Sequence, residues 1–232
     1  LDGDRGRLNV SDVLENINPD NIHFPKTSLV ALENTVNKGG GCYYDLNMIQ
    51  QIHDVAESNN LKMHLDGARI FNALVETGES SLDYGQYFDT ISVCFSKGLG
   101  APVGSAILGS GELIKKARRV RKVLGGAMRQ VGYLAAAAIY ALDNHIARLR
   151  EDHQRARELA GLFEQKSFVT NILSVDTNIV IVSIDPDYGS SRLLEELKSK
   201  DILGVSFGRH TLRFVTHLDI TDDMLTKLKK VI

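Results

Sequence analysis

Two strand-like segments that each end in polar residues followed by glycine constrain the fold most. Lys62 to Leu65 is followed by Asp66-Gly67-Ala68-Arg69, and Thr90 to Phe95 is followed by Ser96-Lys97-Gly98. Helix-like segments alternate with such strands along the chain, and this alternation predicts an α/β fold with a largely parallel sheet. Sites in open α/β sheets gather at the carboxyl edge of the strands. We therefore expect Asp66 and Lys97 to stand at one edge.

The first half of the sequence contains further elements of the same kind. Ser28 to Leu32 is typical of a short buried strand and precedes a glycine-rich loop over 34–41. Asp45 is placed to cap a helix, because apolar residues recur at helical spacing after it. The stretch from Gly126 to about Leu162 is rich in alanine, then charged, and lacks proline, so we expect it to be helical.

The last third of the chain has a different character. Asn178 to Ile184 and Leu212 to Thr216 are typical of strands, Ser191 to Lys198 indicates a helix, and Thr221 is placed to cap a final helix. These elements predict a small α+β unit. We place the boundary so that 1–145 belongs to a large domain and 146–232 forms a small C-terminal domain.

Charge and composition argue against several classes of partner. The 27 basic and 29 acidic residues leave a net charge of −2, which offers no attraction for nucleic acid or an anionic membrane. Apolar runs are too short to span a bilayer. Cys42 and Cys94 form no CxxC pair and no secretory signal opens the sequence, so we expect a cytoplasmic protein and no metal site.

Lys97 is the first candidate for chemistry. Its position after an apolar strand and before Gly98 and Gly100 suggests a side chain that points into a site. Burial lowers the pKa of a lysine and makes it a usable nucleophile toward aldehydes. The alternative, a solvated lysine in a loop, is the commoner outcome for an isolated Ser-Lys-Gly.

Asp66 strengthens the case for Lys97. A pyridoxal-phosphate lysine is accompanied by an acid or arginine that partners the pyridine nitrogen. An aspartate at the end of one strand can reach that nitrogen from a lysine at the end of the next strand. The alternative is an aspartate that caps the turn before Gly67.

Several blocks of the sequence resemble the low-specificity L-threonine aldolase family. The resemblance runs over essentially the whole chain and keeps the order of the family's motifs. Its blocks are His64–Ala73, Ser96–Ser105, Arg121–Gln130 and Leu212–Asp219, together with Ile22-His23-Phe24 and Leu32-Glu33-Asn34-Thr35. Val36 departs from the family, which usually has a histidine there.

The resemblance implies a type I pyridoxal-phosphate fold, the aspartate aminotransferase-like architecture. It implies pyridoxal 5'-phosphate as cofactor, with Lys97 as its Schiff-base lysine and Asp66 on the pyridine nitrogen. Arg69 matches an arginine near the cofactor's phenolic oxygen and the substrate carboxylate, and Arg213 matches the other carboxylate-binding arginine. A planar guanidinium suits this task because it grips a carboxylate through two parallel hydrogen bonds. For Arg213 alone, a surface ion pair is the alternative.

Three further residues receive roles through the resemblance. Lys122 and Arg129 match basic residues that help hold the phosphate across a dimer interface, although the basic cluster around them also fits the solvated face of a helix. His23 matches a histidine near the β-hydroxyl of the substrate, and histidine suits proton transfer because its pKa lies close to working pH. A lone histidine is more often structural.

The family implies the reaction as well. We expect retro-aldol cleavage of L-threonine or L-allo-threonine to glycine and an aldehyde, in a homotetramer with active sites at the dimer interface. Relatives carry roughly a hundred residues before the segment that starts here, so we expect these 232 residues to form only part of a cofactor site. The alternatives are a β-eliminating lyase, a phenylserine aldolase, or a cofactor-less relative that is not an enzyme.

Overall fold

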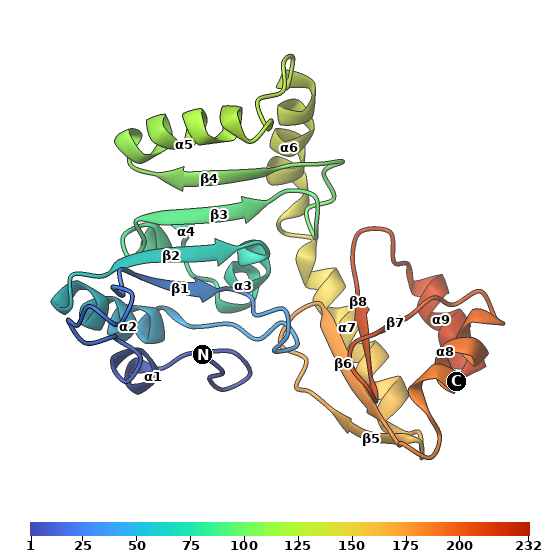
Figure 1. Ribbon diagram of the computed structural model, residues 1–232. Helices are drawn as coiled ribbons and strands as arrows, with labels where there is room; N and C mark the ends of the chain where they lie inside the picture. Colours follow the sequence, from blue (N-terminus) through green and yellow to red (C-terminus); the bar gives the residue numbers. More distant parts are fainter.

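The computed structural model describes residues 1–232, and its first sheet has the order β1-β2-β3-β4 (Figure 1). Strands β1 (Leu29–Glu33), β2 (Lys62–Gly67) and β3 (Thr90–Cys94) are parallel, and β4 (Ser105–Gly109) joins β3 in the antiparallel direction. The parallel strands confirm the predicted α/β fold and bring the ends of β2 and β3 to the same edge of the sheet.

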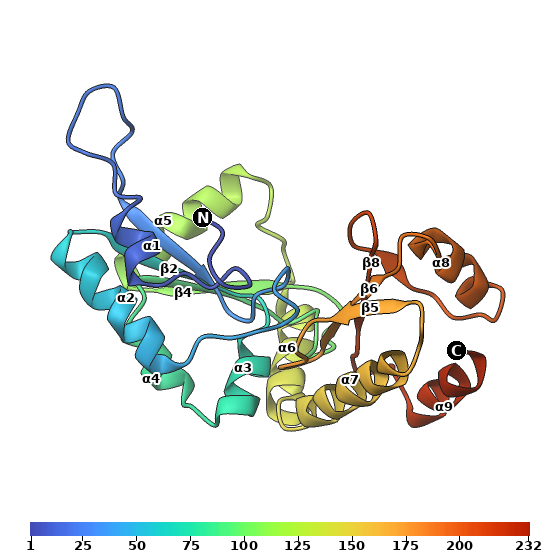
Figure 2. The same ribbon diagram turned by 90° about the horizontal axis from the view of Figure 1, so that it is seen from below.

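Helices cover one face of this sheet. Figure 2 shows α2 (Leu46–Ser58), α3 (Ile70–Thr77) and α4 (Ser81–Gly85) on the same side of the strands. Asp45 caps α2 as predicted, because its side chain accepts a hydrogen bond from the amide of Met48. The apolar side of α2 packs against the sheet through fully buried residues, which include Ile49, Ile52 and Leu65. The short helix α1 (Val10–Leu14) packs on α2.

The second sheet is antiparallel throughout and has the order β5-β6-β8-β7. Its strands are β5 (Val169–Ile172), β6 (Ile179–Ile184), β7 (Val205–Ser206) and β8 (Thr211–Val215). Helix α7 (Leu149–Glu164) packs against β5 and β6, and α8 (Ser190–Lys198) and α9 (Asp222–Val231) complete the unit. Phe163, Val180 and Leu212 are fully buried in its core, which is separate from the core of the first sheet.

The stretch from Gly126 to about Leu162 is largely helical as predicted, but it forms two helices and begins later than expected. The chain forms α6 (Gly132–His145) and α7, and residues 124–131 form a loop after α5 (Gly111–Val123). The loop turns through Gly125 and Gln130, which both have positive φ angles. At the break between α6 and α7, Nδ1 of His145 lies 2.6 Å from the carbonyl oxygen of Leu99. This tertiary contact holds the chain where α6 ends.

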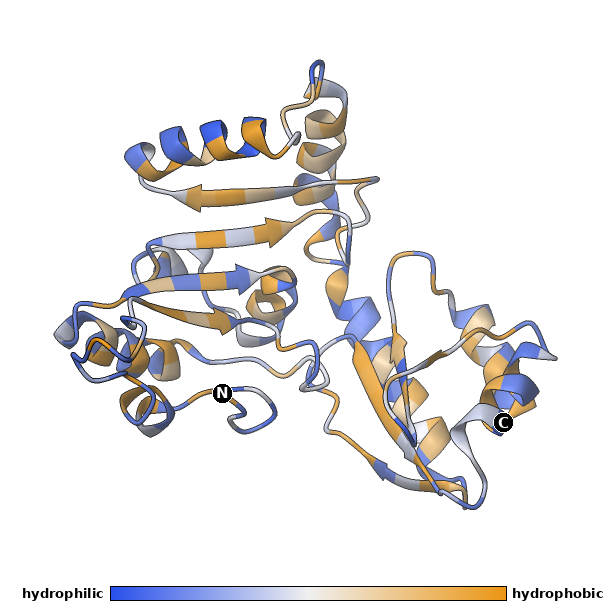
Figure 3. Ribbon diagram, viewed as in Figure 1, coloured by the Kyte–Doolittle hydropathy of each residue, from blue (hydrophilic) through white to orange (hydrophobic).

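Apolar side chains remain exposed on α5, α6 and β4. Figure 3 shows hydrophobic and hydrophilic residues interleaved along α5. The exposed apolar residues of this region are Ile107, Leu108, Leu113, Val120, Val123, Leu124, Met128, Val131, Tyr133, Ile139 and Tyr140. None of the helices combines the length and the apolar character that crossing a bilayer requires.

Candidate active site

The carboxyl ends of the first three strands present polar side chains on one face of the sheet. Glu33, Asp66 and Ser92 lie opposite one another in the strand register. Leu65 is fully buried on the helix-covered face, and since successive side chains of a strand alternate, Asp66 points to the other face. The sheet therefore holds an acidic pair, Glu33 and Asp66, on its uncovered side.

Asp66 is exposed and is held in place by two hydrogen bonds. Its Oδ1 accepts from the amide of Ala68 at 3.1 Å and from the hydroxyl of Ser92 at 3.4 Å. The hydrogen bond from Ala68 closes the local turn before Gly67, which was the alternative role considered for Asp66. The other carboxylate oxygen, Oδ2, forms no hydrogen bond, so it is free to meet a ligand above the sheet.

Arg69 and Arg213 converge on a single acceptor, the side-chain oxygen of Asn37. Nη1 of Arg213 donates to Oδ1 of Asn37 at 2.9 Å, and Nη1 of Arg69 donates to the same atom at 3.4 Å. Arg69 follows β2 in the first sheet, whereas Arg213 lies on β8 of the second sheet. The phenyl ring of Phe207 supports Arg213, with the guanidinium carbon 4.9 Å from the ring centre.

Neither guanidinium group donates a hydrogen bond to a negatively charged side chain. Burial and the nearby Arg213 charge lower the pKa of Arg69, while Glu33, Cys94 and Asp66 act in the opposite direction. The Nε atoms of both Arg69 and Arg213 are buried without any hydrogen-bond partner. Because a buried donor without an acceptor is costly, this pair is suited to a ligand that carries a carboxylate.

Lys97 lies in the turn between β3 and β4. The turn is closed by hydrogen bonds of 2.9 Å from the Gly100 amide to the Lys97 carbonyl and from the Ala101 amide to the Phe95 carbonyl. The Lys97 side chain is exposed and forms no hydrogen bond or ion pair. The expectation of a buried lysine is therefore wrong for this chain, because neighbouring elements pack against the backbone of the turn at Gly98 and not over the Lys97 side chain.

The backbone beside Lys97 rests on buried side chains. A Cβ atom at Gly98 would lie 3.0 Å from Cδ2 of Leu149 and 3.3 Å from Oδ1 of Asn72. Asn72 is 2% exposed, and its Nδ2 lies 2.9 Å from Nε2 of His153, which is fully buried. The other ring nitrogen of His153 contacts the carboxylate of Glu76. The lysine turn is thus seated on α3 and α7 together.

Lys122, Arg129 and His23 form no hydrogen bond or ion pair with these groups within one chain. Lys122 is exposed in the last turn of α5, and Arg129 is exposed in the loop that follows α5. His23 is exposed in the loop before β1, which extends away from the rest of the molecule (Figure 2). This loop enters β1 at the amino edge of the sheet, opposite to Asp66. The roles given to these three residues remain predictions.

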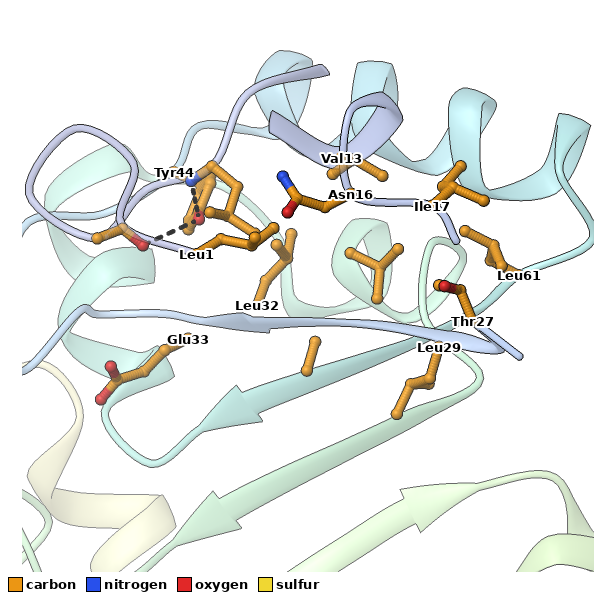
Figure 4. Close-up of a pocket in the computed structure, with 14 residues that line it drawn as sticks. Leu1, Val13, Asn16, Ile17, Thr27, Leu29, Leu32, Glu33, Tyr44 and Leu61 are labelled. Carbon is orange, nitrogen blue, oxygen red and sulfur yellow. Dashed lines mark hydrogen bonds between the residues drawn. The ribbon is translucent and has the colours of Figure 1, made fainter. Parts of the chain in front are cut away.

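A pocket of about 340 Å³ lies next to the site, and Glu33 belongs to its lining. Asp66, Lys97 and the two arginines do not line this pocket. It is mainly apolar and lies between β1 and the N-terminal segment with α1, where Val13, Ile17 and Leu32 contribute to its wall (Figure 4). The hydroxyl of Tyr44 accepts from the amide of Leu8 at 2.7 Å at one end. Figure 4 shows Glu33 on the opposite side of β1 from Leu32, turned toward the uncovered face of the sheet.

Sequence reasoning did not single out Asn37, Asn72 or His153. The glycine-rich loop after β1 was a signal for Asn37, because glycines at 40 and 41 with positive φ angles allow the tight return of the chain. No local pattern marks Asn72 and His153, which meet across 81 positions of sequence. Their contact depends on how α3 packs against α7.

Comparison with known proteins assigns the chain to a family. The model of the beta-eliminating lyase family matches residues 1–186. The chain belongs to this family. Among the curated relatives of this chain, a probable low-specificity L-threonine aldolase 2 from Arabidopsis thaliana is 43% identical over 204 residues, and the low specificity L-threonine aldolase of Escherichia coli K12 is 40% identical over 223 residues.

The alignments cover most of this chain but a smaller share of those relatives. They include 87% of this chain and 58% of the plant protein, and 96% of this chain and 65% of the bacterial protein. The chain therefore spans about three fifths of the length of the curated relatives that it matches.

Solved structures confirm the fold of this family member. A threonine aldolase from Leishmania major superimposes with a TM-score of 0.82 at 20% identity, covering 98% of this chain and 67% of that chain. Ornithine delta-aminotransferase from Plasmodium falciparum superimposes with a TM-score of 0.61 at 14% identity, over 88% of this chain and 54% of that chain. The predicted aminotransferase-like architecture is thus confirmed.

Proposed function

We propose that the protein cleaves L-threonine and L-allo-threonine to glycine and acetaldehyde with pyridoxal 5'-phosphate as cofactor. The observation that carries this proposal is the convergence of Arg69 and Arg213 on one oxygen at the sheet edge that also carries Asp66. The names of the curated relatives, which are low-specificity L-threonine aldolases, support the choice of substrate.

The residues of this edge fit the cofactor. Lys97 offers a free amine for its aldehyde, and Asp66 offers a free carboxylate oxygen for its pyridine nitrogen. When bound, the cofactor supplies an electron sink for the bond broken at the substrate Cα. The carboxylate of Asp66 keeps the ring nitrogen protonated, which makes that sink effective. Lys122 and Arg129 are proposed to contact the phosphate.

The two arginines are proposed to orient the substrate. Their guanidinium groups grip the carboxylate of the amino acid, and the buried Nε donors that lack partners take part in this contact. Fixing the carboxylate turns the Cα–Cβ bond into the orientation that it needs for cleavage. Such alignment contributes much of an enzyme's rate enhancement, because the entropy lost in orienting the substrate is compensated by binding before the reaction begins.

The β-hydroxyl proton needs a base, for which His23 and a bound water are the candidates. Because His23 enters from the amino edge of the sheet, its role requires that a second copy of the chain brings it to the site. The exposed apolar residues on α5, α6 and β4 support such self-association, and we propose a homotetramer of tight dimers with active sites at the dimer interface. A cytoplasmic location, and a division of the chain into 1–145 and 146–232, belong to the same proposal.

The test is a comparison of products. We expect the protein, expressed from its complete reading frame and loaded with pyridoxal phosphate, to release glycine and acetaldehyde from threonine. Release of pyruvate and ammonia from serine in place of glycine from threonine would identify a β-eliminating lyase. Faster cleavage of phenylserine than of threonine would identify a phenylserine aldolase. Failure to bind the cofactor would identify a relative that is not an enzyme.

A further inference from the structure

Asn37 occupies the junction between the two sheets and the two arginines. Its Oδ1 accepts from Nη1 of Arg213 at 2.9 Å and from Nη1 of Arg69 at 3.4 Å, so one neutral oxygen joins a residue of each sheet. No other side-chain acceptor contacts either guanidinium group. Asn37 therefore determines how these two groups face each other.

The loop that carries Asn37 is held firmly on both sides. The amide of Asn37 donates to Oε1 of Glu33 at 3.2 Å. Beyond Asn37, the hydroxyl of Thr177 donates to the carbonyl of Gly41 at 2.7 Å, and Nε of Arg5 donates to the carbonyl of Gly39 at 2.8 Å. These contacts tie the loop to the segment that leads into β6 and to the N-terminal segment, so Asn37 is a fixed tether for the arginines.

The charge of the residue at this position matters more than its shape. A carboxamide oxygen accepts hydrogen bonds without carrying a charge, so both guanidinium charges remain available to an incoming anion. A carboxylate of the same shape would form two charge-assisted hydrogen bonds and would cancel one of the two positive charges. The unpartnered Nε atoms of Arg69 and Arg213 show that the tether leaves part of their donor capacity unused.

We propose that Asn37 is a specificity-determining residue that holds Arg69 and Arg213 together without neutralising them, which reserves their charge for the substrate carboxylate. This inference rests on the proposed function of the site. It predicts opposite effects on stability and on substrate affinity when Asn37 becomes aspartate. An ordinary structural asparagine would not separate these two properties in this way.

The experiment compares Asn37→Asp with the wild type in the protein from the complete reading frame. Without substrate, the thermal midpoint of Asn37→Asp is expected to equal or exceed that of the wild type. KM for threonine is expected to rise about ten-fold or more, because the substrate must displace a charged competitor. KM for threoninamide, whose neutral carboxamide does not depend on the arginine charges, is expected to stay within about two-fold.

Two further variants complete the design. Asn37→Ala removes the tether, so its thermal midpoint is expected to fall, and KM for threonine to rise less than in Asn37→Asp. Asn171→Asp adds the same charge at an exposed position of β5 that forms no side-chain contact, and KM is expected to be unchanged there.

Several outcomes would overturn the inference. These are a lower thermal midpoint for Asn37→Asp, wild-type affinity of that variant for threonine, or an equal loss of affinity for threonine and threoninamide. If the wild type itself releases no glycine from threonine, the proposed function fails, whereas the thermal comparison still decides whether Asn37 tethers two charged groups.

Discussion

Arg69 and Arg213 come from different sheets and yet share one hydrogen-bond acceptor. Their common contact with Asn37 means that the site for a carboxylate is assembled within one chain before any substrate arrives. The relative position of its two donors is set where the loop after β1 meets the segment that leads into β6 and the strand β8. Changes to either arginine should therefore affect binding of the carboxylate more than folding of the chain.

Replacing Arg213 with lysine tests this directly. Lysine keeps the charge but cannot offer the planar fork of donors, so Arg213→Lys is expected to lose about 2 kcal/mol or more of transition-state binding for threonine. Steady-state kinetics measure this as a fall in kcat/KM. Arg209→Lys is a matched control, because Arg209 has no side-chain contact in this structure. Equal effects of the two substitutions would count against a carboxylate-binding role for Arg213.

Gly98 is expected to tolerate no side chain. A Cβ atom there would meet Leu149 at 3.0 Å and Asn72 at 3.3 Å. Gly98→Ala is expected to lower the free energy of unfolding by about 1–3 kcal/mol through overpacking, and to impair turnover because the turn carries Lys97. Chemical denaturation measures the first effect.

Gly161 provides the matched control for Gly98. It lies inside α7, and a Cβ atom there would meet nothing within 4 Å. Gly161→Ala is expected to raise the free energy of unfolding by about 0.5–1 kcal/mol, since alanine favours the helix. A Gly98→Ala protein as stable and active as Gly161→Ala would show that the lysine turn is not seated as described.

His153 is expected to make the fold sensitive to acid. Burial lowers its pKa, and this effect outweighs the opposite effect of Glu76. The charged groups that face His153 are Glu76 from α3, and Arg157 and Asp152 from its own helix. The folded protein thus keeps the imidazole neutral, whereas in the unfolded chain it titrates near its ordinary pKa of about 6.5.

The sign of the pH effect follows from proton binding. Below about pH 6.5 the unfolded chain binds more protons at this position than the folded protein, so stability is fully present above that pH and falls as the pH drops toward the folded pKa. Denaturation between about pH 7.5 and 5 should show this loss, and His153→Gln should reduce the slope. An unchanged slope in His153→Gln would rule out His153 as the titrating group.

Asp66 is expected to matter to the cofactor more than to the fold. Asp66→Asn retains an acceptor for the Ala68 amide but loses the charge, so we expect turnover to fall about 100-fold or more with little change in thermal midpoint. Ser92→Ala removes only the 3.4 Å hydrogen bond to Asp66, and its effect should be small. Comparable losses in both variants would mean that the position of Asp66, and not its charge, is what the reaction needs.

Much of the first sheet could be predicted from sequence. The strands around Leu65 and Val93 are apolar runs that end in polar residues and glycine, and the structure places Asp66 and Lys97 at neighbouring strand ends accordingly. Parallel pairing brings the carboxyl ends to one edge, so the local pattern is sufficient there. The caps of α2 and α9 by Asp45 and Thr221 are local in the same sense and were also predicted correctly.

The remainder depends on contacts between distant parts of the chain. The break between α6 and α7 follows neither composition nor a capping side chain, because Arg148 makes no cap hydrogen bond. The exposure of Lys97 depends on which elements cover the sheet edge. The meeting of Arg213 with Asn37 spans 176 positions and arises from the packing of the second sheet on the loop after β1.

Turnover by a Lys97→Ala variant tests the central claim most directly. The wild type and a Lys230→Ala control, altered at an exposed residue of α9, are assayed beside it for glycine released from threonine. We expect no glycine from Lys97→Ala and normal release from the control, because Lys97 is the amine that holds the cofactor. Normal glycine release by Lys97→Ala would contradict the proposed chemistry.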